Sequence, residues 1–484
     1  MIGKIIGFSV LGIFGLLLIF MLLRTLLTKK PKIDNASYTP HDVDLDRVRD
    51  HLIGAVQIPT VTLSDNDQDG SIFYEYQAYL EKSYPKIMAV AEKTLVNKYA
   101  VIYTVKGSDE SLLPCAILAH QDVVPAPEDG WEVPPFSGQV KDGYIYGRGS
   151  QDMKSQMIIA LEGLEILLED GLYPKRTMMF CFGHDEELRG TYGALEISKY
   201  LNKQGVKLEY VIDEGGTILD GSILGINNKI ALIGTCEKGY ADYVLEVEKD
   251  GGHSSAPTRR TSVGILSEAM YKIEKRKRPT MWTKPTKDMF KALAPHMNFG
   301  FKLALVNRDI LSPLLKYVLS IVSPFTNCLV RTTLAPTQTS GAHTPNTLAP
   351  VARGNVNCRL NTGETTAQVQ KYIQKIAGKN VKVSVLEGYC DPSPVSDIDT
   401  DAFRALSKTI SEVFDGYIAA PYPFIAASDA KHYYNLTNCV YRFTPFEKSI
   451  EDGNRIHGMN ERQSVASLEL GTRFFLRLYE NTCF

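Results

Sequence analysis

The sequence predicts an α/β protein whose main sheet has helices on both faces and which carries a smaller inserted α/β domain. Apolar runs typical of β-strands occur at residues 116–119, 178–182 and 210–212. Helical stretches separate them, such as residues 157–168, where apolar residues recur at helical spacing and Gly171 follows the end. Strands that alternate with helices indicate a sheet covered on both faces. Each apolar run leads into a polar motif, and reactive groups of such sheets gather where strands end.

The composition is that of an ordinary globular protein. Of 484 residues, 44% are apolar and 22% are charged, with a formal net charge of −2. This is enough apolar material for a large core and two domains. The near-neutral charge provides no electrostatic footprint for a nucleic acid, so we expect no nucleic-acid partner. The eight cysteines show no CxxC spacing, which argues against a structural zinc knuckle, and they permit disulfides without requiring any.

The first 28 residues predict a signal-anchor transmembrane helix. Residues 5–23 carry no charge and lie between Lys4 and Arg24. As a helix this run is roughly 28 Å long, close to the hydrocarbon thickness of a bilayer. A cleavable signal peptide is the alternative, although its apolar region is normally shorter. A buried core helix is disfavoured because the run is apolar on every side. Residues 29–43 are polar, contain two prolines and predict a tether.

Two features disagree about the side of the membrane on which the chain lies. The basic residues follow the apolar run, which favours the cytoplasm. The glycosylation sequons at residues 35–37 and 435–437 matter only in a lumenal or extracellular chain. We expect a membrane-anchored glycoprotein with a lumenal or extracellular globular part, or a secreted one, mainly on the family resemblance described below.

The pattern changes near residue 238. Further strand-like and helical stretches follow it, at residues 240–247, 265–273, 351–360 and 381–386. We therefore predict that residues 44–237 and 388–484 form the first domain. Residues 238–387 would form the second α/β domain, inserted into the first.

Acidic and histidine residues follow the apolar runs and recur near the C-terminus. They are His120, Asp122, Asp152, Glu186, Glu187, Asp213 and His457. Nitrogen and oxygen ligands without thiolates suit zinc or a similar divalent ion in a catalytic, incompletely filled shell. A carboxylate shared by two ions about 3.5–4 Å apart would suit a site that activates a bridging water. Asp122 lies two residues after His120, on the same side of an extended segment, where it can bond the far ring nitrogen and hold its tautomer.

Each of these residues also has an ordinary structural explanation. His120 alone is more often a hydrogen-bonded core histidine than a ligand. Glu186 and Glu187 resemble a solvated surface pair, residues 213–215 a turn and residues 147–149 a loop. The ordered set at successive strand ends is what favours a metal site.

Five longer stretches carry more information than the single residues. They are AHQDVVPAPEDGWEVPPFSG, YGRGSQDMK, GHDEELRGTYGA, VIDEGG and RIHGMNER. Within residues 115–216 and 456–462 they resemble the di-zinc metallopeptidase family that includes aminoacylase, carboxypeptidase S and carnosine dipeptidase. The resemblance extends from about residue 45 to the C-terminus. It implies a zinc-dependent exopeptidase-type catalytic domain with a mixed sheet, a lid formed by residues 238–387, and an enzyme that cleaves amide or peptide bonds.

The resemblance implies a role for each candidate residue. The ligands would be His120 and Asp213 for one of two Zn2+ ions, Glu187 and His457 for the other, and Asp152 as the bridge. Glu186 would be the general base, which takes a proton from the metal-bridged water and passes it to the leaving amine. Asp122 would assist catalysis beside His120. The resemblance also implies a cis peptide bond between Asp152 and Met153.

Three residues of the lid are assigned to the substrate by the same resemblance. His253 would stabilise the tetrahedral oxyanion, and Asn346 would contact the substrate. Arg359 would grip a substrate carboxylate, because a guanidinium binds a carboxylate with two parallel hydrogen bonds; a surface salt bridge is the alternative. One segment departs from the family: Gly-Thr-Asp-x-Arg is replaced by Ala-Ser-Asp-Ala-Lys at residues 427–431, and lysine cannot make that two-point contact.

Within the family, the stretches VQIPTVT, GHSSAP and VRTT resemble the N-fatty-acyl-amino-acid synthase/hydrolase branch, with carboxypeptidase S next. We therefore expect an enzyme of lipid metabolism that hydrolyses, and reversibly forms, N-acyl amino acids as small-molecule substrates. A carboxypeptidase or dipeptidase shares every catalytic residue and stays an alternative. An inactive binding protein of the same fold predicts lost ligands, and none is lost.

An apolar stretch at about residues 297–325 allows several interpretations. It can line a channel for an acyl chain, form part of the lid core, or lie at a lid–lid or membrane contact. Many members of the family dimerise through the lid and others do not, so a homodimer through the lid and a monomer both stay open.

Overall fold

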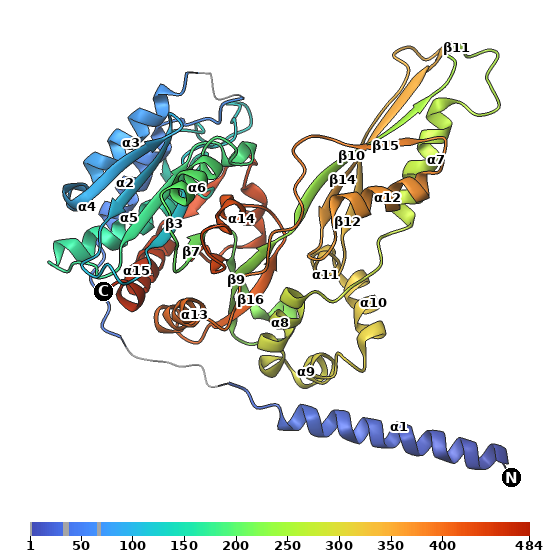
Figure 1. Cartoon of the computed structure of the whole chain (residues 1–484), viewed down its shortest axis with the longest axis horizontal. Helices are drawn as coiled ribbons and strands as arrows, with labels where there is room; N and C mark the ends of the chain where they lie inside the picture. Colours follow the sequence, from blue (N-terminus) through green and yellow to red (C-terminus); the bar gives the residue numbers. More distant parts are fainter. Residues whose placement is uncertain (1, 32–37, 65–68) are drawn as a thin grey trace.

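The computed structural model describes residues 2–31, 38–64 and 69–484. It shows a body, an arm that projects from it, and a long N-terminal helix near the base of the arm (Figure 1). Within the described residues, the body contains a nine-stranded sheet in the order β1-β2-β6-β3-β7-β17-β9-β16, with β8 beside β9. The strands are β1 (Ala91–Val96), β2 (Ala100–Val105), β3 (Cys115–His120), β6 (Met178–Gly183), β7 (Val211–Asp213), β8 (Thr217–Asp220), β9 (Lys229–Glu237), β16 (Ile418–Phe424) and β17 (Val440–Arg442). Because β3 pairs in parallel with β6 and β7 while β2 pairs with β1 and β6 antiparallel, the sheet is mixed, as predicted.

Helices cover both faces of this sheet, which confirms the predicted α/β class. One face carries α2 (Leu45–Gln57), α3 (Ser71–Ser83), α4 (Pro85–Val90), α5 (Lys154–Glu169), α13 (Asp401–Val413) and α15 (Val465–Thr482), and the other carries α6 (Ala194–Lys203) with η4 (Asp429–Tyr433). Ile117 of β3 lies in the larger core with Tyr479, whereas its neighbour Leu118 lies in the smaller core with Ile197. A strand buried on both sides reads as a continuous apolar run, which is why β3 is recognisable in the sequence.

The arm contains a four-stranded antiparallel sheet in the order β12-β14-β10-β15. Its elements are β10 (Gly239–Glu248), β12 (Thr333–Ser340), β14 (Val351–Leu360) and β15 (Lys382–Val385), with α7 (Ser262–Lys275) and α12 (Thr366–Ala377) packed against them. Along β10, buried residues alternate with half-buried ones, so one face of the sheet forms the core of the arm. The short pair β11 (Gly252–His253) and β13 (Thr347–Leu348) lies at the tip, away from the body (Figure 1).

Four short helices inside residues 238–387 pack on the body rather than on the sheet of the arm. They are α8 (Lys284–Leu293), α9 (Phe299–Val306), α10 (Ser312–Val322) and α11 (Pro324–Leu329). Phe290 of α8 and Leu305 of α9 share a core cluster with Ile230 of β9 and Tyr422 of β16. Part of the apolar stretch at residues 297–325 therefore fills a core at the edge of the large sheet.

Apart from the N-terminal helix, the remaining elements among the described residues are short. They are β4 (Val140–Lys141), β5 (Tyr144–Tyr146) and β18 (Arg462–Ser464), which form a small sheet, together with α14 (Ile450–Arg455), η1 (Glu186–Leu188), η2 (Gly221–Leu224) and η3 (Ala294–His296).

The N-terminal apolar run forms one helix, α1 (Ile2–Leu27). Among the described residues, no helix combines the length and apolar character that crossing a membrane requires, so the predicted signal-anchor is not supported. The sequon at residues 35–37, within the predicted tether, lies outside the described residues. Asn435, which begins the second sequon, is exposed.

Candidate metal centre

Three strands of the large sheet bring the polar motifs to one edge. β3 ends at His120, β6 ends just before His184, and β7 ends at Asp213. Because β3 runs parallel to both β6 and β7, the carboxyl ends of the three strands lie at the same edge. The short helix η1, which carries Glu186 and Glu187, follows β6 there.

Asp152 lies between two histidines at this edge. Its Oδ1 is 3.0 Å from Nε2 of His120, and its Oδ2 is 3.1 Å from Nε2 of His457. Nε2 of His457 is also 3.0 Å from Oε2 of Glu187. His120, Asp152 and Glu187 offer ligand atoms that lie within 4.8 Å of one another. The two oxygens of Asp152 thus face different imidazoles, which is the arrangement that a ligand shared by two cations needs.

Two motifs far apart in the sequence hold Asp152 in place. The buried Oε1 of Glu461 accepts hydrogen bonds from the backbone N–H groups of Gln151, at 2.8 Å, and Asp152, at 3.1 Å. Its Oε2 pairs with the buried Arg148 at 2.5 Å. The peptide bond between Asp152 and Met153 is cis, as predicted. Sequence reasoning did not single out Arg148 or Glu461, although both lie in the matched stretches.

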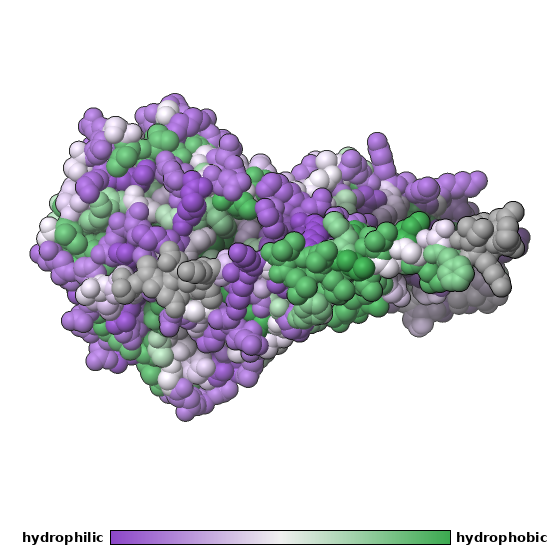
Figure 2. All heavy atoms as spheres, turned by 90° about the horizontal axis from the view of Figure 1, so that it is seen from below, coloured by the Kyte–Doolittle hydropathy of each residue, from purple (hydrophilic) through white to green (hydrophobic). Residues whose placement is uncertain are grey.

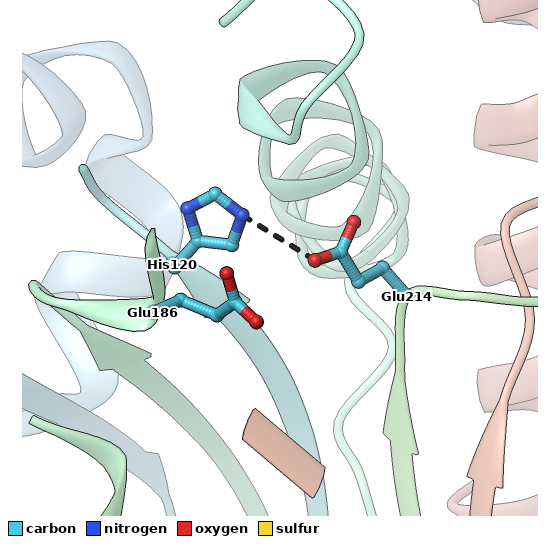
Figure 3. Close-up of side chains that lie close together, drawn as sticks. All are labelled: His120, Glu186 and Glu214. Carbon is cyan, nitrogen blue, oxygen red and sulfur yellow. Dashed lines mark ion pairs between the residues drawn. The ribbon is translucent and has the colours of Figure 1, made fainter. Parts of the chain in front are cut away.

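The structure brings Glu214, not Asp213, to His120. Oε1 of Glu214 is 3.4 Å from Nε2 of His120, and these two side chains and Glu186 point toward one another (Figure 3). The buried carboxylate of Asp213 instead accepts hydrogen bonds from the backbone N–H groups of Glu214 and Ala430, both at 2.8 Å. Successive side chains at a strand end point in opposite directions. The Asp-Glu-Gly motif alone therefore does not tell which of its two carboxylates faces His120.

Asp122 orients the groups around it. Nδ1 of His120 lies 2.9 Å from the backbone carbonyl of Asp122, and since a carbonyl only accepts, Nδ1 carries the proton and Nε2 faces Asp152. The carboxylate of Asp122 accepts hydrogen bonds from the backbone N–H groups of Glu186 and Glu187, at 3.1 and 3.2 Å. Burial acts to raise the pKa of Asp122, but its contacts with His120 lower that pKa below its ordinary value.

The ionisable side chains at this edge lie close together and shift one another's pKa values. Burial, with the nearby Asp429 and Glu214 carboxylates, raises the pKa of Glu186 well above its ordinary value. Burial and the neighbouring Asp152 raise the pKa of Glu214 to about 7. Hydrogen bonds to Asp152 and Glu187 raise the pKa of His457 to about 10. Carboxylates packed this closely repel one another, and a divalent cation between them relieves that repulsion.

The donor set fits a divalent transition metal. Two imidazoles and several carboxylates converge without a thiolate, which suits zinc in a catalytic site. Among the described residues, Oε1 of Glu187 is buried without a hydrogen-bond partner. A buried carboxylate oxygen without a partner is the kind of atom that a metal satisfies.

The candidate lid residues lie elsewhere. His253 and Asn346 are exposed neighbours at the tip of the arm, where the backbone N–H of Ser254 donates to the carbonyl of Asn346 at 2.9 Å. This tip is far from the end of β3 (Figure 1). Arg359 lies on β14 with its guanidinium 4.9 Å from the ring centre of Tyr240. The structure brings His253 and Asn346 together at this tip, away from the strand ends of the body.

The segment at residues 427–431, which departs from the family pattern, forms hydrogen bonds with buried acidic residues next to the candidate metal centre. Ala430 donates its backbone N–H to Asp213, as described above, and Ser428 donates its hydroxyl to the buried Glu237 at 2.9 Å. Glu237 in turn pairs with the fully buried Arg442 at 2.5 Å. Lys431 is only half-buried, and its positive charge opposes the rise in the pKa of Glu186.

The chain is similar in sequence to known proteins over most of its length. The sequence model of peptidase family M20/M25/M40 matches residues 116–481. The chain is 41% identical over 436 residues to an N-fatty-acyl-amino acid synthase/hydrolase PM20D1 of Xenopus tropicalis, covering 89% of this chain and 85% of that one. It is 32% identical to a probable carboxypeptidase S-like 2 of Dictyostelium discoideum, covering 96% and 92%.

A solved structure has the same fold. The M20 family metallo-carboxypeptidase Sso-CP2 of Sulfolobus solfataricus superposes with a TM-score of 0.64 at 18% identity, covering 89% of this chain and 99% of that one. The family match spans most of the chain and includes the strand ends and motifs described above. This protein therefore belongs to peptidase family M20/M25/M40.

Proposed function

We propose that this chain is a di-zinc amidohydrolase that cleaves, and reversibly forms, the amide bond of N-acyl amino acids. As a member of its family it is a metallohydrolase that acts on amide or peptide bonds. The observation that carries the proposal is Asp152, whose two carboxylate oxygens face different histidines while Glu186 lies beside them. The similarity to N-fatty-acyl-amino acid synthase/hydrolases over most of the chain supports the substrate class.

We assign the ligands from the geometry. His120 and Glu214 would hold one zinc ion, and Glu187 and His457 the other, with Asp152 between them. The family resemblance puts Asp213 in the position that we give to Glu214. When bound, two zinc ions supply Lewis acidity and lower the pKa of a water shared between them. Because a ligand imidazole must be neutral, His457 has to release the proton that Asp152 and Glu187 favour.

Glu186 moves the proton in this proposal. Its carboxylate accepts a proton from the attacking water and then donates it to the nitrogen of the leaving amino acid. Burial raises the pKa of Glu186, and a higher pKa makes its carboxylate a stronger base for the proton of the attacking water. The hydrogen bond from its backbone N–H to Asp122 fixes its position during the transfer.

The lid residues would act after the arm approaches the body. Arg359 would bind the carboxylate of the amino-acid half, and His253 would donate to the oxyanion of the acyl carbonyl. Such a contact favours substrates with a free carboxylate, which N-acyl amino acids and peptides share.

The test compares two matched substrates on the zinc-loaded full chain. We would measure kcat/KM for N-oleoyl-phenylalanine and for a plain dipeptide, with Glu186→Gln as the inactive control and Glu110→Gln, at an exposed site, as the matched control. Preference for the acyl amino acid is the expected result. Preference for the dipeptide would move the chain to the carboxypeptidase branch, which the similarity to carboxypeptidase S-like proteins favours as the second candidate. No turnover of either with zinc bound would indicate a binding protein.

A lumenal or extracellular location is part of the same proposal. Its support is the exposed Asn435 at the start of an Asn-Leu-Thr sequon. In a eukaryotic secretory host, a mobility shift on deglycosylation that disappears in Asn435→Gln is the expected outcome. A chain that carries no glycan in that host would contradict it.

A further inference from the structure

An exposed apolar face lies outside the catalytic site, on α9 and α10. The exposed fractions are 52% for Phe299 and Phe301, 58% for Leu314, 62% for Tyr317 and Ile321, and 65% for Val322. On α10, Leu314, Tyr317 and Ile321 recur at helical spacing, while Leu315 and Leu319, on a neighbouring side of the helix, pack in the core beneath. The exposed apolar residues are therefore not needed to fill the core beneath these helices, which contains other apolar residues. Soluble monomers rarely expose large contiguous apolar patches without an interaction to serve.

The helix α1 extends this face and is fixed to it by specific contacts. The fully buried Asn307, which follows α9, donates to the backbone carbonyl of Met21 at 3.2 Å and to the hydroxyl of Thr25 at 3.1 Å. Lys302 donates to the carbonyl of Thr28 at 2.7 Å, and both oxygens of Asp309 accept from Arg24, at 2.7 and 2.8 Å. A buried amide shared between two helices holds them in one register.

The apolar side chains of α1 face solvent over most of its described length. Phe14 is 66% exposed and Leu18 is 53% exposed. Figure 2 shows apolar atoms gathered in one band over α1 and the adjoining segment, whereas the surface of the body is mostly hydrophilic. On the face drawn in Figure 2, the apolar band is therefore confined to one region.

The charged residues in the segments that form the band are mostly basic. Residues 11–31 and 297–325 contain six basic side chains, Arg24, Lys29, Lys30, Lys302, Arg308 and Lys316, and one acidic side chain, Asp309. The single carboxylate is already paired with Arg24. An apolar face on segments with an excess of lysines and arginines fits a lipid surface with anionic headgroups, because basic side chains can meet the phosphates while apolar ones enter the acyl boundary.

We propose that α1 and the α9–α10 segment form a lipid-docking surface, which lies against an anionic phospholipid surface with the exposed face of α10 in contact with it. The catalytic residues play no part in this surface, so the proposal stands whether or not the substrate is a fatty-acyl amino acid. If the substrate is amphiphilic, docking there would place the enzyme at the lipid surface in which its substrate accumulates.

The test measures amide hydrogen exchange of the full chain with and without vesicles of phosphatidylcholine and phosphatidylserine. We expect residues 312–322 to gain protection with these vesicles and to gain less with phosphatidylcholine alone or at high salt. In a triple variant, Tyr317→Ser, Ile321→Ser and Val322→Ser, the vesicle concentration needed for half of this protection should rise about tenfold, because three large apolar contacts are lost.

A matched triple variant controls for the general loss of exposed apolar area. Leu95→Ser, Leu113→Ser and Tyr173→Ser change residues of the body that are 48%, 46% and 49% exposed, and should leave the protection of α10 unchanged. Equal thermal unfolding of both variants and of the parent checks that each one folds.

Two results would overturn the proposal. One is the absence of protection in α10 while the chain binds vesicles through other residues. The other is protection without vesicles that grows with protein concentration, since a second copy of the chain would then cover the face. Neither readout needs turnover, so a failure here is distinguishable from a failure of the proposed catalytic function.

Discussion

The side chains at the strand ends of the body are fixed by buried contacts, whereas the candidate substrate residues at the tip of the arm are held by exposed ones. His120 and Asp122 are almost completely buried, and each is held through backbone hydrogen bonds. His253 is exposed, and its Nδ1 contacts only the nearby Ser255, at 2.7 Å, among the hydrogen bonds described for it. The residues of the candidate metal centre therefore all come from the body, whereas His253 at the tip of the arm lies away from them.

Because of this difference, we expect amino-acid substitutions in the two regions to have different effects on activity. Replacements at the strand ends should alter metal binding or chemistry for every substrate. Replacements on the arm should alter the choice of substrate and leave the metal content as it is. The connection between the regions is short, because β9 ends at Glu237 and β10 begins at Gly239.

The largest expected effect is that of Glu186→Gln. Loss of the proton-transfer group should lower kcat by about 10²- to 10⁴-fold for acyl amino acids and dipeptides alike. The zinc content, measured by mass spectrometry of the metal, should stay at the parent value, with Glu110→Gln as the control. Because Glu186 also lies close to His120 and Glu214, a variant that loses zinc would show that Glu186 is a ligand and not the base.

The next effect distinguishes two adjacent carboxylates. Glu214→Gln should lower zinc affinity by more than about 100-fold, because it removes a direct ligand. Asp213→Asn should lower it by about tenfold, since Asp213 only fastens the backbone of Glu214 and Ala430. Competition with a chelator measures both affinities. The opposite ranking would return the ligand role to Asp213, as the family resemblance implies.

These two carboxylates also show how far the sequence could predict the site. The buried strands were recognisable because both faces of the sheet are covered, and their ends located the Asp-Glu-Gly motif. Which of the two acids faces His120 depends on Ala430, which lies 217 residues after Asp213 and whose backbone N–H holds the Asp213 carboxylate. No local pattern contains that contact.

The same limit applies to the arm. The spacing of apolar residues predicted strands and helices in residues 238–387. It did not predict that α8 packs on β16 of the body, because the apolar face of a helix does not indicate which element it packs against. Glu461 is a comparable case at the site. It is one of many acidic residues in the sequence, and only the fold shows that it holds the backbone of Asp152.

A smaller and more selective effect is expected on the arm. Arg359→Ala should lower kcat/KM for an N-acyl amino acid by about 10- to 100-fold, because a charge-assisted contact with the carboxylate is lost. Turnover of the corresponding N-acyl amino-acid amide, which has no carboxylate, and the zinc content should not change. Arg353→Ala is the control on the same strand, since its side chain is 61% exposed and pairs with Glu246 at 2.6 Å. Equal losses for both substrates would mean that Arg359 supports the arm and not the substrate.

The smallest expected effect concerns acid stability of the body behind the metal centre. Burial and the nearby Lys431 lower the pKa of His432 to about 4, and its Nε2 lies 2.9 Å from the carbonyl of Arg189. Below the ordinary histidine pKa of about 6.5 the unfolded chain binds a proton that the folded chain refuses until the pH approaches 4. The free energy of unfolding should therefore decrease as the pH falls through this window, by about 2 kcal/mol between pH 7 and 5 from this residue. Urea unfolding of His432→Asn at the two pH values measures the difference, and the variant should lose that part of the pH dependence. If the free energy of unfolding of the variant depends on pH as the parent's does, His432 binds its proton in the folded chain as readily as in the unfolded one. The segment around His432 would then be as accessible to water as the tip of the arm.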